Sequence, residues 1–185
     1  MARTSAAPDA ASENPDQKNP ETPTQDDRSA QAARDDQLLR SYADALADEV
    51  ERALPGWVGA AVAARTGGRI PHQLADAVAG AGTEAAADVG GQVRSLLELD
   101  IDDQWTNPLT LVRTAIKYPN QVLRDAGVAP ISRDAQSERF HPEDVYGLIP
   151  SSFADLGPTA HDLGLSWGAA KAHVHLRRRR AEEVS

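Results

Sequence analysis

The basic C-terminal end holds the residues of this sequence that are best suited to binding chemistry. Four consecutive arginines follow a lysine, a histidine and a tryptophan within one short stretch. Guanidinium groups bind phosphates and carboxylates through paired hydrogen bonds, and a nearby aromatic ring can stack on a base. The sequence therefore offers a candidate surface for a polyanion or a protein partner, made of Trp167, Lys171, His173, Arg177, Arg178, Arg179 and Arg180.

Two other interpretations of this basic end stay open. Cations in the last turn of a helix offset the partial negative charge there, and this role needs no partner. The arginines could also pair with acids of the same chain, because residues 1–36 carry a net charge of −4 and residues 37–170 one of −8. If the arginines instead contact phosphates, binding will weaken steeply with added salt, because each contact releases counterions.

A catalytic hypothesis rests on titratable groups just before the last predicted helix. His141, Glu143, Tyr146 and His161 could form the acid–base site of a small enzyme. The chain has neither the glycine loop that cradles phosphates nor the G-x-S-x-G turn of a serine nucleophile. We therefore rank an enzyme below an interaction protein.

The histidines do not have the spacing of metal ligands. His173 and His175 are two residues apart, so on a helix they point in different directions. His161-Asp162 resembles a ligand pair of metal-dependent phosphohydrolases of the HD type, but those need a later aspartate, and none follows Asp162. Cysteine is absent, which excludes thiolate sites and disulfides. The sequence predicts no metal and no cofactor.

The elements that must position these residues are helices. Apolar residues recur at helical spacing and predict long helices over 36–66, 71–98, 108–126 and 166–180. Pro55 and Pro119 predict kinks, whereas Gly67, Gly68 and Gly127 mark helix ends. We expect an all-α domain of about four to six helices, in which the second long helix packs antiparallel to the first.

Three segments do not fit this helical pattern. Residues 1–35 contain no Val, Leu, Ile, Phe, Tyr or Trp, so they predict a disordered acidic arm. Residues 128–158 are rich in proline and glycine but keep apolar residues, which predicts an irregular segment wrapped over the helical domain of residues 36–180. Residues 181–185 are a short tail.

Composition narrows the class of protein further. Residues 1–20 lack the apolar core of a secretory signal, and no apolar run approaches the roughly 20 residues that span a bilayer. The abundance of alanine and arginine is typical of a GC-rich bacterial genome. We expect a cytoplasmic, non-enzymatic interaction or accessory protein with a protein partner and a recognition surface in its C-terminal third. Nucleic acid bound by the arginine cluster is the alternative partner, and no membrane contact is expected.

Overall fold

A computed structural model describes residues 25–99, 107–131, 150 and 152–183 of the 185-residue chain. Within these residues all regular secondary structure is helical, so the all-α prediction is confirmed. The helices are α1 (Gln25–Arg65), α2 (Ala75–Ala85), α3 (Gly91–Leu99), α4 (Leu109–Val112), α5 (Lys117–Asp125) and α8 (Pro158–Glu183). Short 3₁₀ turns are η1 (His72–Leu74), η3 (Arg113–Ile116) and η4 (Phe153–Leu156), and η2 (Ala86–Gly90) is a π-helical segment.

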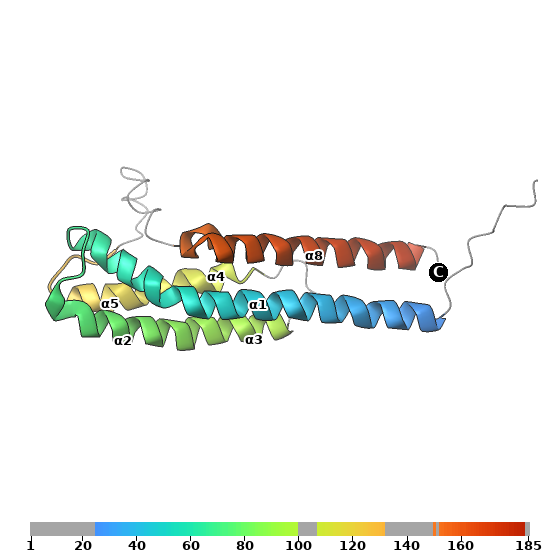
Figure 1. Ribbon diagram of the computed structural model, residues 1–185, viewed down its shortest axis with the longest axis horizontal. Coiled ribbons are helices and arrows are strands. Elements are labelled where there is room, and N and C mark those ends of the chain that lie inside the picture. The colour runs from blue at the N-terminus through green and yellow to red at the C-terminus, as the bar shows by residue number, and fades with distance from the viewer. Residues whose placement is uncertain (1–24, 100–106, 132–149, 151, 184–185) are drawn as a thin grey trace, which may run out of the picture.

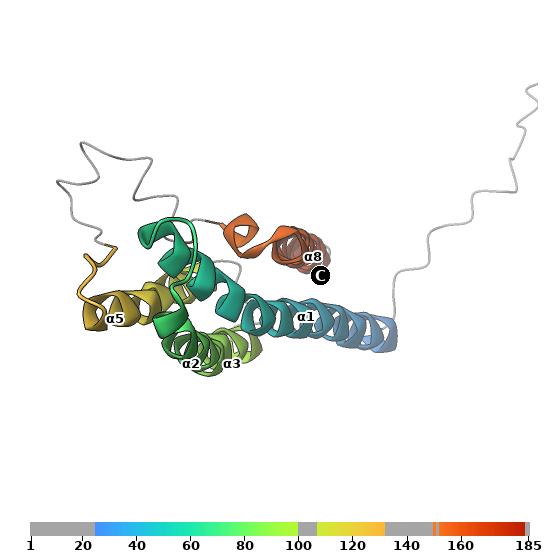
Figure 2. The same ribbon diagram turned by 60° about the vertical axis from the view of Figure 1, so that its left-hand side comes forward.

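Helix α1 lies at the centre of the bundle (Figure 1). The nearly continuous helix formed by α2, η2 and α3 runs back along one side of α1, which is the predicted antiparallel packing. Helix α8 lies on the opposite side of α1, as the second view shows (Figure 2), and is also antiparallel to it. The segment from α4 to α5 closes the end of the bundle that is distant from both the first turn of α1 and the last turn of α8.

The core runs along α1. Leu46, Val50, Leu54 and Val58 are completely buried, and they repeat every four residues, which keeps successive side chains near one side of a helix. Ala43, Ala47 and Ala61 are buried beside them. Because α1 contacts other helices on more than one side, its buried apolar residues lie on more than one face of the helix.

Close helix packing depends on two glycines of the second long helix. A Cβ atom on Gly82 would lie 2.9 Å from the Cα atom of Pro55, and one on Gly90 would lie 2.3 Å from the Cγ atom of Glu51. Both distances are shorter than the non-bonded contacts that real Cβ atoms make. The absence of a side chain at Gly82 and Gly90 therefore lets this helix approach the backbone of α1.

Proline and glycine set the other helix limits largely as predicted. Helix α1 continues through Pro55 but bends in its C-terminal part (Figure 1). A proline inside a helix removes one backbone hydrogen bond, because it has no N–H group, and this permits the bend. The side chain of Asn107 accepts a hydrogen bond from the backbone N–H of Leu109 at 3.1 Å, which caps α4. Gly127, with φ of 69°, ends α5 in the left-handed conformation.

Two predicted helix starts and one predicted helix end are wrong. Helix α8 ends at Glu183 and not at residue 180, so residues 181–183 belong to this helix and not to the predicted tail. Helix α1 begins at Gln25, so residues 25–35 are helical and not part of a disordered arm; the rest of the predicted arm lies outside the described residues. Helix α8 begins at Pro158 and not near residue 166, because proline suits the first turn of a helix, where its missing N–H group would have no partner.

The predicted wrapping segment, residues 128–158, lies mostly outside the described residues. Its first residues do contact the bundle: Ile131 is buried, and its backbone N–H and C=O groups both bond to the side chain of Asn120, at 2.6 and 2.8 Å. Its last residues contain η4, which begins with a capping box between Ser152 and Asp155.

The two glycines of α2 allow a matched test of this packing. We expect Gly82→Ala to destabilise the protein by about 1–3 kcal/mol, because the added carbon must displace the Pro55 backbone. Gly80→Ala should stabilise it by roughly 0.5–1 kcal/mol, because Gly80 is exposed and a Cβ there meets nothing within 4 Å. Urea unfolding followed by circular dichroism measures both changes. Equal effects of the two substitutions would contradict the close approach.

Candidate functional site

The predicted basic surface lies where the end of α8 meets the beginning of α1. Leu39 of α1 and Ala170 and Val174 of α8 form a small buried cluster, against which Tyr42 packs. Beyond this cluster toward the free ends, the contacts between the two helices become polar. Arg177 pairs with Asp35, and Arg178 pairs with Asp36 at 2.7 Å.

Asp35 is the most buried member of these ion pairs. The residue is only 3% exposed, and its Oδ1 atom accepts hydrogen bonds from Arg177 and from the Gln31 side chain, the latter at 2.8 Å. A buried carboxylate needs such partners, because it has lost its hydration. Two of the four consecutive arginines are therefore held by acids of the same chain, which is the intramolecular interpretation of the basic end.

Trp167 and Lys171 occupy the interior and not the surface. Each is about 7% exposed, and the Lys171 Nζ atom lies 4.6 Å from the centre of the Trp167 ring, within the range of a cation–π interaction. Trp167 belongs to the main core. Binding of nucleic acid at this end would favour an aromatic ring that stacks on a base. Because the Trp167 ring is buried, it is not available for such stacking.

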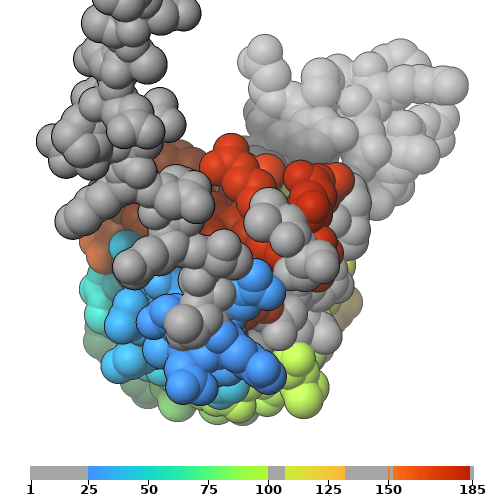
Figure 3. Space-filling model, turned by 90° about the vertical axis from the view of Figure 1, so that its right-hand side faces the viewer, coloured from blue at the N-terminus to red at the C-terminus, as the bar shows by residue number. Residues whose placement is uncertain are grey.

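A cleft of about 980 Å³ opens between α1 and α8 at this end of the molecule. In Figure 3 the first turns of α1 and the last turns of α8 face the viewer there. Among the residues that the structure describes, five cations and three carboxylates line the cleft: Arg28, Arg34, Arg177, Arg178, Arg180, Asp27, Asp35 and Glu182. We call this space the end cleft. Ala30, Gln31, Ala32 and Ala181 also line it.

The structure thus separates the predicted surface into three groups. Trp167 and Lys171 are in the interior, and Arg177 and Arg178 hold α8 to α1 through their ion pairs with Asp35 and Asp36, which we call the α1–α8 seam. His173, Arg179 and Arg180 are exposed. Arg28 and Arg34, which sequence reasoning had placed in the arm, join Arg180 at the end cleft.

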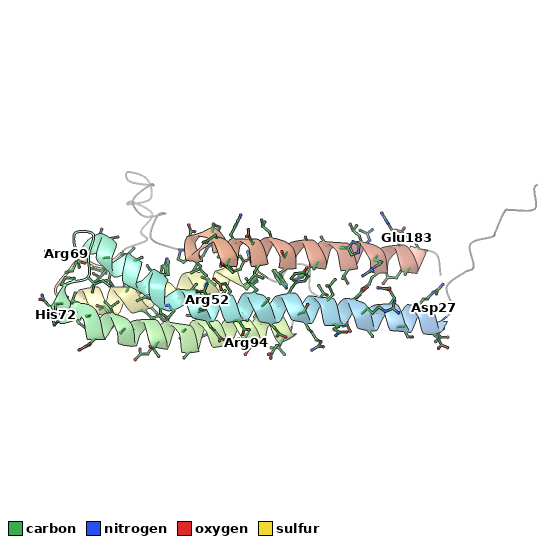
Figure 4. All side chains as sticks on the ribbon, viewed as in Figure 1. Asp27, Arg52, Arg69, His72, Arg94 and Glu183 are labelled. Carbon is green, nitrogen blue, oxygen red and sulfur yellow. The ribbon has the colours of Figure 1, made fainter. Side chains whose placement is uncertain are left out.

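The side-chain view shows how the charged ends of the molecule lie (Figure 4). Asp27 of α1 and Glu183 of α8 lie at the end where the cleft opens, whereas Arg69 and His72 lie at the opposite end.

Midway along α1, Arg94 of α3 forms ion pairs with Asp48 at 2.6 Å and Glu51 at 3.0 Å. These two pairs connect α3 to α1.

The proposed catalytic residues are only partly covered by the structure. His161 is exposed on α8, whereas His141, Glu143 and Tyr146 lie outside the described residues. Within the described part of the chain, no three His, Asp or Glu side chains are grouped as a metal site would require. The helices of this part are also too short or too polar to cross a membrane.

A second charged cluster was not found by sequence reasoning. Asp88 lies in the π-helical segment η2, and its carboxylate accepts hydrogen bonds from Lys117 at 2.6 Å, Tyr118 at 2.7 Å and Gln92 at 2.7 Å. The bonds from Lys117, then Tyr118 and Gln92, lower the pKa of Asp88 to about 2. Although π-helical segments often occur at functional sites, this cluster joins η2 to α5 and has a clear structural role.

Comparison of the chain with protein-family models, with curated proteins and with solved structures found no match. Conclusions about function therefore depend on the geometry of this chain.

The burial of Asp35 predicts unequal effects of two neighbouring substitutions. We expect Asp35→Asn to lower the free energy of unfolding by about 1–3 kcal/mol, because Arg177 loses the charge that it faces. Asp36→Asn should cost less than about 1 kcal/mol, because the Asp36 side chain is 44% exposed. Urea unfolding measures both, and a double-mutant cycle with Arg177→Gln should show coupling at Asp35 alone. Equal losses at the two positions would contradict the seam as described.

The low pKa of Asp88 predicts a contribution to stability that depends on pH. The folded pKa lies below the ordinary value of 3.8, so the contribution is present above that pH and is lost as the pH falls toward 2. Asp88→Asn should therefore be less stable than the wild type at about pH 6, with the difference shrinking toward about pH 2. Carbon-13 NMR titration of the Asp88 carboxyl group gives its pKa directly, and an ordinary pKa would contradict this prediction.

Proposed function

We propose that this protein is a non-enzymatic interaction protein that binds an acidic segment of a protein partner in the end cleft. The observation that carries the proposal is the convergence of five arginines from two antiparallel helices on one open space of about 980 Å³. Guanidinium groups bind carboxylates through two parallel hydrogen bonds, so an arrangement of this kind favours Asp- or Glu-rich ligands.

The charge balance of the end cleft favours a peptide over a nucleic acid. Three carboxylates lie among the five arginines, and Asp35 already neutralises part of the charge of Arg177. The whole chain carries a net charge of −9, so a long polyanion would be repelled beyond the cleft. A short acidic segment can contact the arginines without extending over the acidic body.

The lining of the end cleft also suits a peptide. Ala30, Ala32 and Ala181 contribute apolar surface between the charged groups. None of the described residues that line this space is aromatic, whereas proteins that bind single-stranded nucleic acid use aromatic rings for stacking. Mixed apolar and charged surface is typical of protein interfaces.

Arg34 provides the most direct test of this proposal. It is exposed, lines the end cleft, and takes part in no ion pair within the described residues, so Arg34→Glu reverses a charge of the cleft without breaking the α1–α8 seam. A photoreactive amino acid at the neighbouring Ala32, introduced in cells of the source organism, should crosslink to a polypeptide. We expect Arg34→Glu to reduce this adduct about tenfold.

Arg69→Glu is the matched control, because it makes the same charge change at the opposite end of the molecule (Figure 4). The control should leave the adduct unchanged. An adduct that nuclease removes would instead support the nucleic-acid alternative. Equal adduct with Arg34→Glu and with Arg69→Glu would reject the end cleft as the recognition surface.

A further inference from the structure

Helix α8 exposes an apolar stripe on the face that points away from α1. Leu165 is 60% exposed and Leu176 is 54% exposed, although both are large aliphatic residues. Ala169 and Ala172 lie between them and are also exposed. The intervals of four, three and four residues place all four side chains on one face of the helix. We call these residues the outer stripe.

The opposite face of α8 is also apolar. Trp167, Ala170 and Val174 are buried toward α1, so this helix has apolar residues on two faces. A helix with two apolar faces is expected to be covered on both sides. None of the described elements covers the outer stripe.

The outer stripe matches a second copy of itself when the two helices run in opposite directions. Its centre lies between Ala170 and Lys171, at equal distances from Leu165 and Leu176 and from Ala169 and Ala172. An antiparallel copy therefore places each leucine opposite the other leucine of the second copy, and each alanine opposite the other alanine. Small residues at the centre let the two helix axes approach closely, and the leucines cover both ends of the contact.

The charges beside the outer stripe select the same arrangement. Asp162 and Arg180 are 18 residues apart, which is about five helical turns, so they lie along one edge of the stripe. In an antiparallel pair Asp162 of each copy meets Arg180 of the other, which gives two interactions of opposite charge. A parallel pair would instead place Arg179 and Arg180 beside the same two residues of the second copy, because Arg177 and Arg178 face α1.

We propose that a second copy of this chain covers the outer stripe, and that two α8 helices pack antiparallel across a twofold axis. In such a dimer the same patch of both subunits forms the contact. The axis passes near the middle of α8, so the two end clefts lie at opposite ends of the dimer. The leucines and alanines of the outer stripe lie on a different face of α8 from the end cleft, and Arg180 is the one described residue that belongs both to the cleft and to the edge of the stripe. The dimer does not depend on the function proposed for the end cleft.

The first test is the mass of the full chain in solution across a range of concentrations. Sedimentation should show an increase from 19.7 kDa toward twice this mass as the concentration rises. Leu165→Gln combined with Leu176→Gln should raise the dissociation constant at least about tenfold. Leu99→Gln is the matched control, because Leu99 is 82% exposed but lies at the end of α3, and it should have no effect.

The second test is charge reversal at the edge of the stripe. Asp162→Arg alone and Arg180→Asp alone should each weaken the dimer, because each brings like charges together. The two substitutions in one chain should restore it, since the opposite charges meet again with their positions exchanged. Asp76→Arg, an exposed position in the first turn of α2, controls for the change in net charge. Failure of the double variant to restore association would overturn the proposed register.

Disulfide formation tests direction, because the natural chain has no cysteine that would interfere. When a chain with Ala169→Cys is mixed with one that carries Ala172→Cys, the antiparallel dimer should form the mixed disulfide in preference to either symmetric one. Ala77→Cys on the exposed side of α2 is the control that should stay unlinked. A chain that stays monomeric at all concentrations, or one that forms mainly symmetric disulfides, would overturn the proposal. So would occupation of the stripe by a different protein.

Discussion

The burial of α1 from more than one side is the constraint on which the other elements depend. Its 41 residues form a rod about 60 Å long. The α2–α3 helix covers one side of this rod, and α8 covers the other. Leu46, Val50 and Leu54 are completely buried between these layers. Because both layers contact the same central helix, a shift of α1 would disturb both, and the position of α8 is set by the residues of α1.

Small side chains make this packing possible. The chain has only eight aromatic residues, and alanine contributes little apolar area for each residue buried. Stability must then come from close approach of the helices, because dispersion contacts require neighbouring atoms at short distances. Gly82 against Pro55 and Gly90 against Glu51 are the positions where this approach is closest. Even one added methyl group at Gly82 would separate the helices.

The arginines of α8 have different roles although they are adjacent in sequence. Successive residues on a helix point about 100° apart, so consecutive arginines cannot all face the same partner. Arg177 and Arg178 face α1 and meet Asp35 and Asp36, while Arg179 and Arg180 remain exposed. The same rotation puts Trp167 in the core and Leu165 on the outside. One helix therefore presents an internal seam, one wall of the end cleft and the outer stripe.

The sequence by itself determined the class of fold and many of the helix limits. Apolar periodicity, together with the turn chemistry of Gly67 and Gly127, is local information, and it predicted the all-α fold correctly. It also left open whether the arginines would pair within the chain. The errors in the two helix starts, at Gln25 and Pro158, have a common origin. Both segments lack a strong apolar pattern of their own, so local rules gave them no helix.

Only the tertiary structure decided which charges meet. Asp35 and Arg177 are 142 residues apart, and nothing in their local sequence selects one carboxylate among 28 acids. The contact exists because the two helices that carry them are antiparallel and in a fixed register, which is set by the cluster of Leu39, Ala170 and Val174. The burial of Trp167 and the end cleft follow from the same packing. Composition and spacing describe one segment at a time, whereas these features depend on the relative positions of two helices.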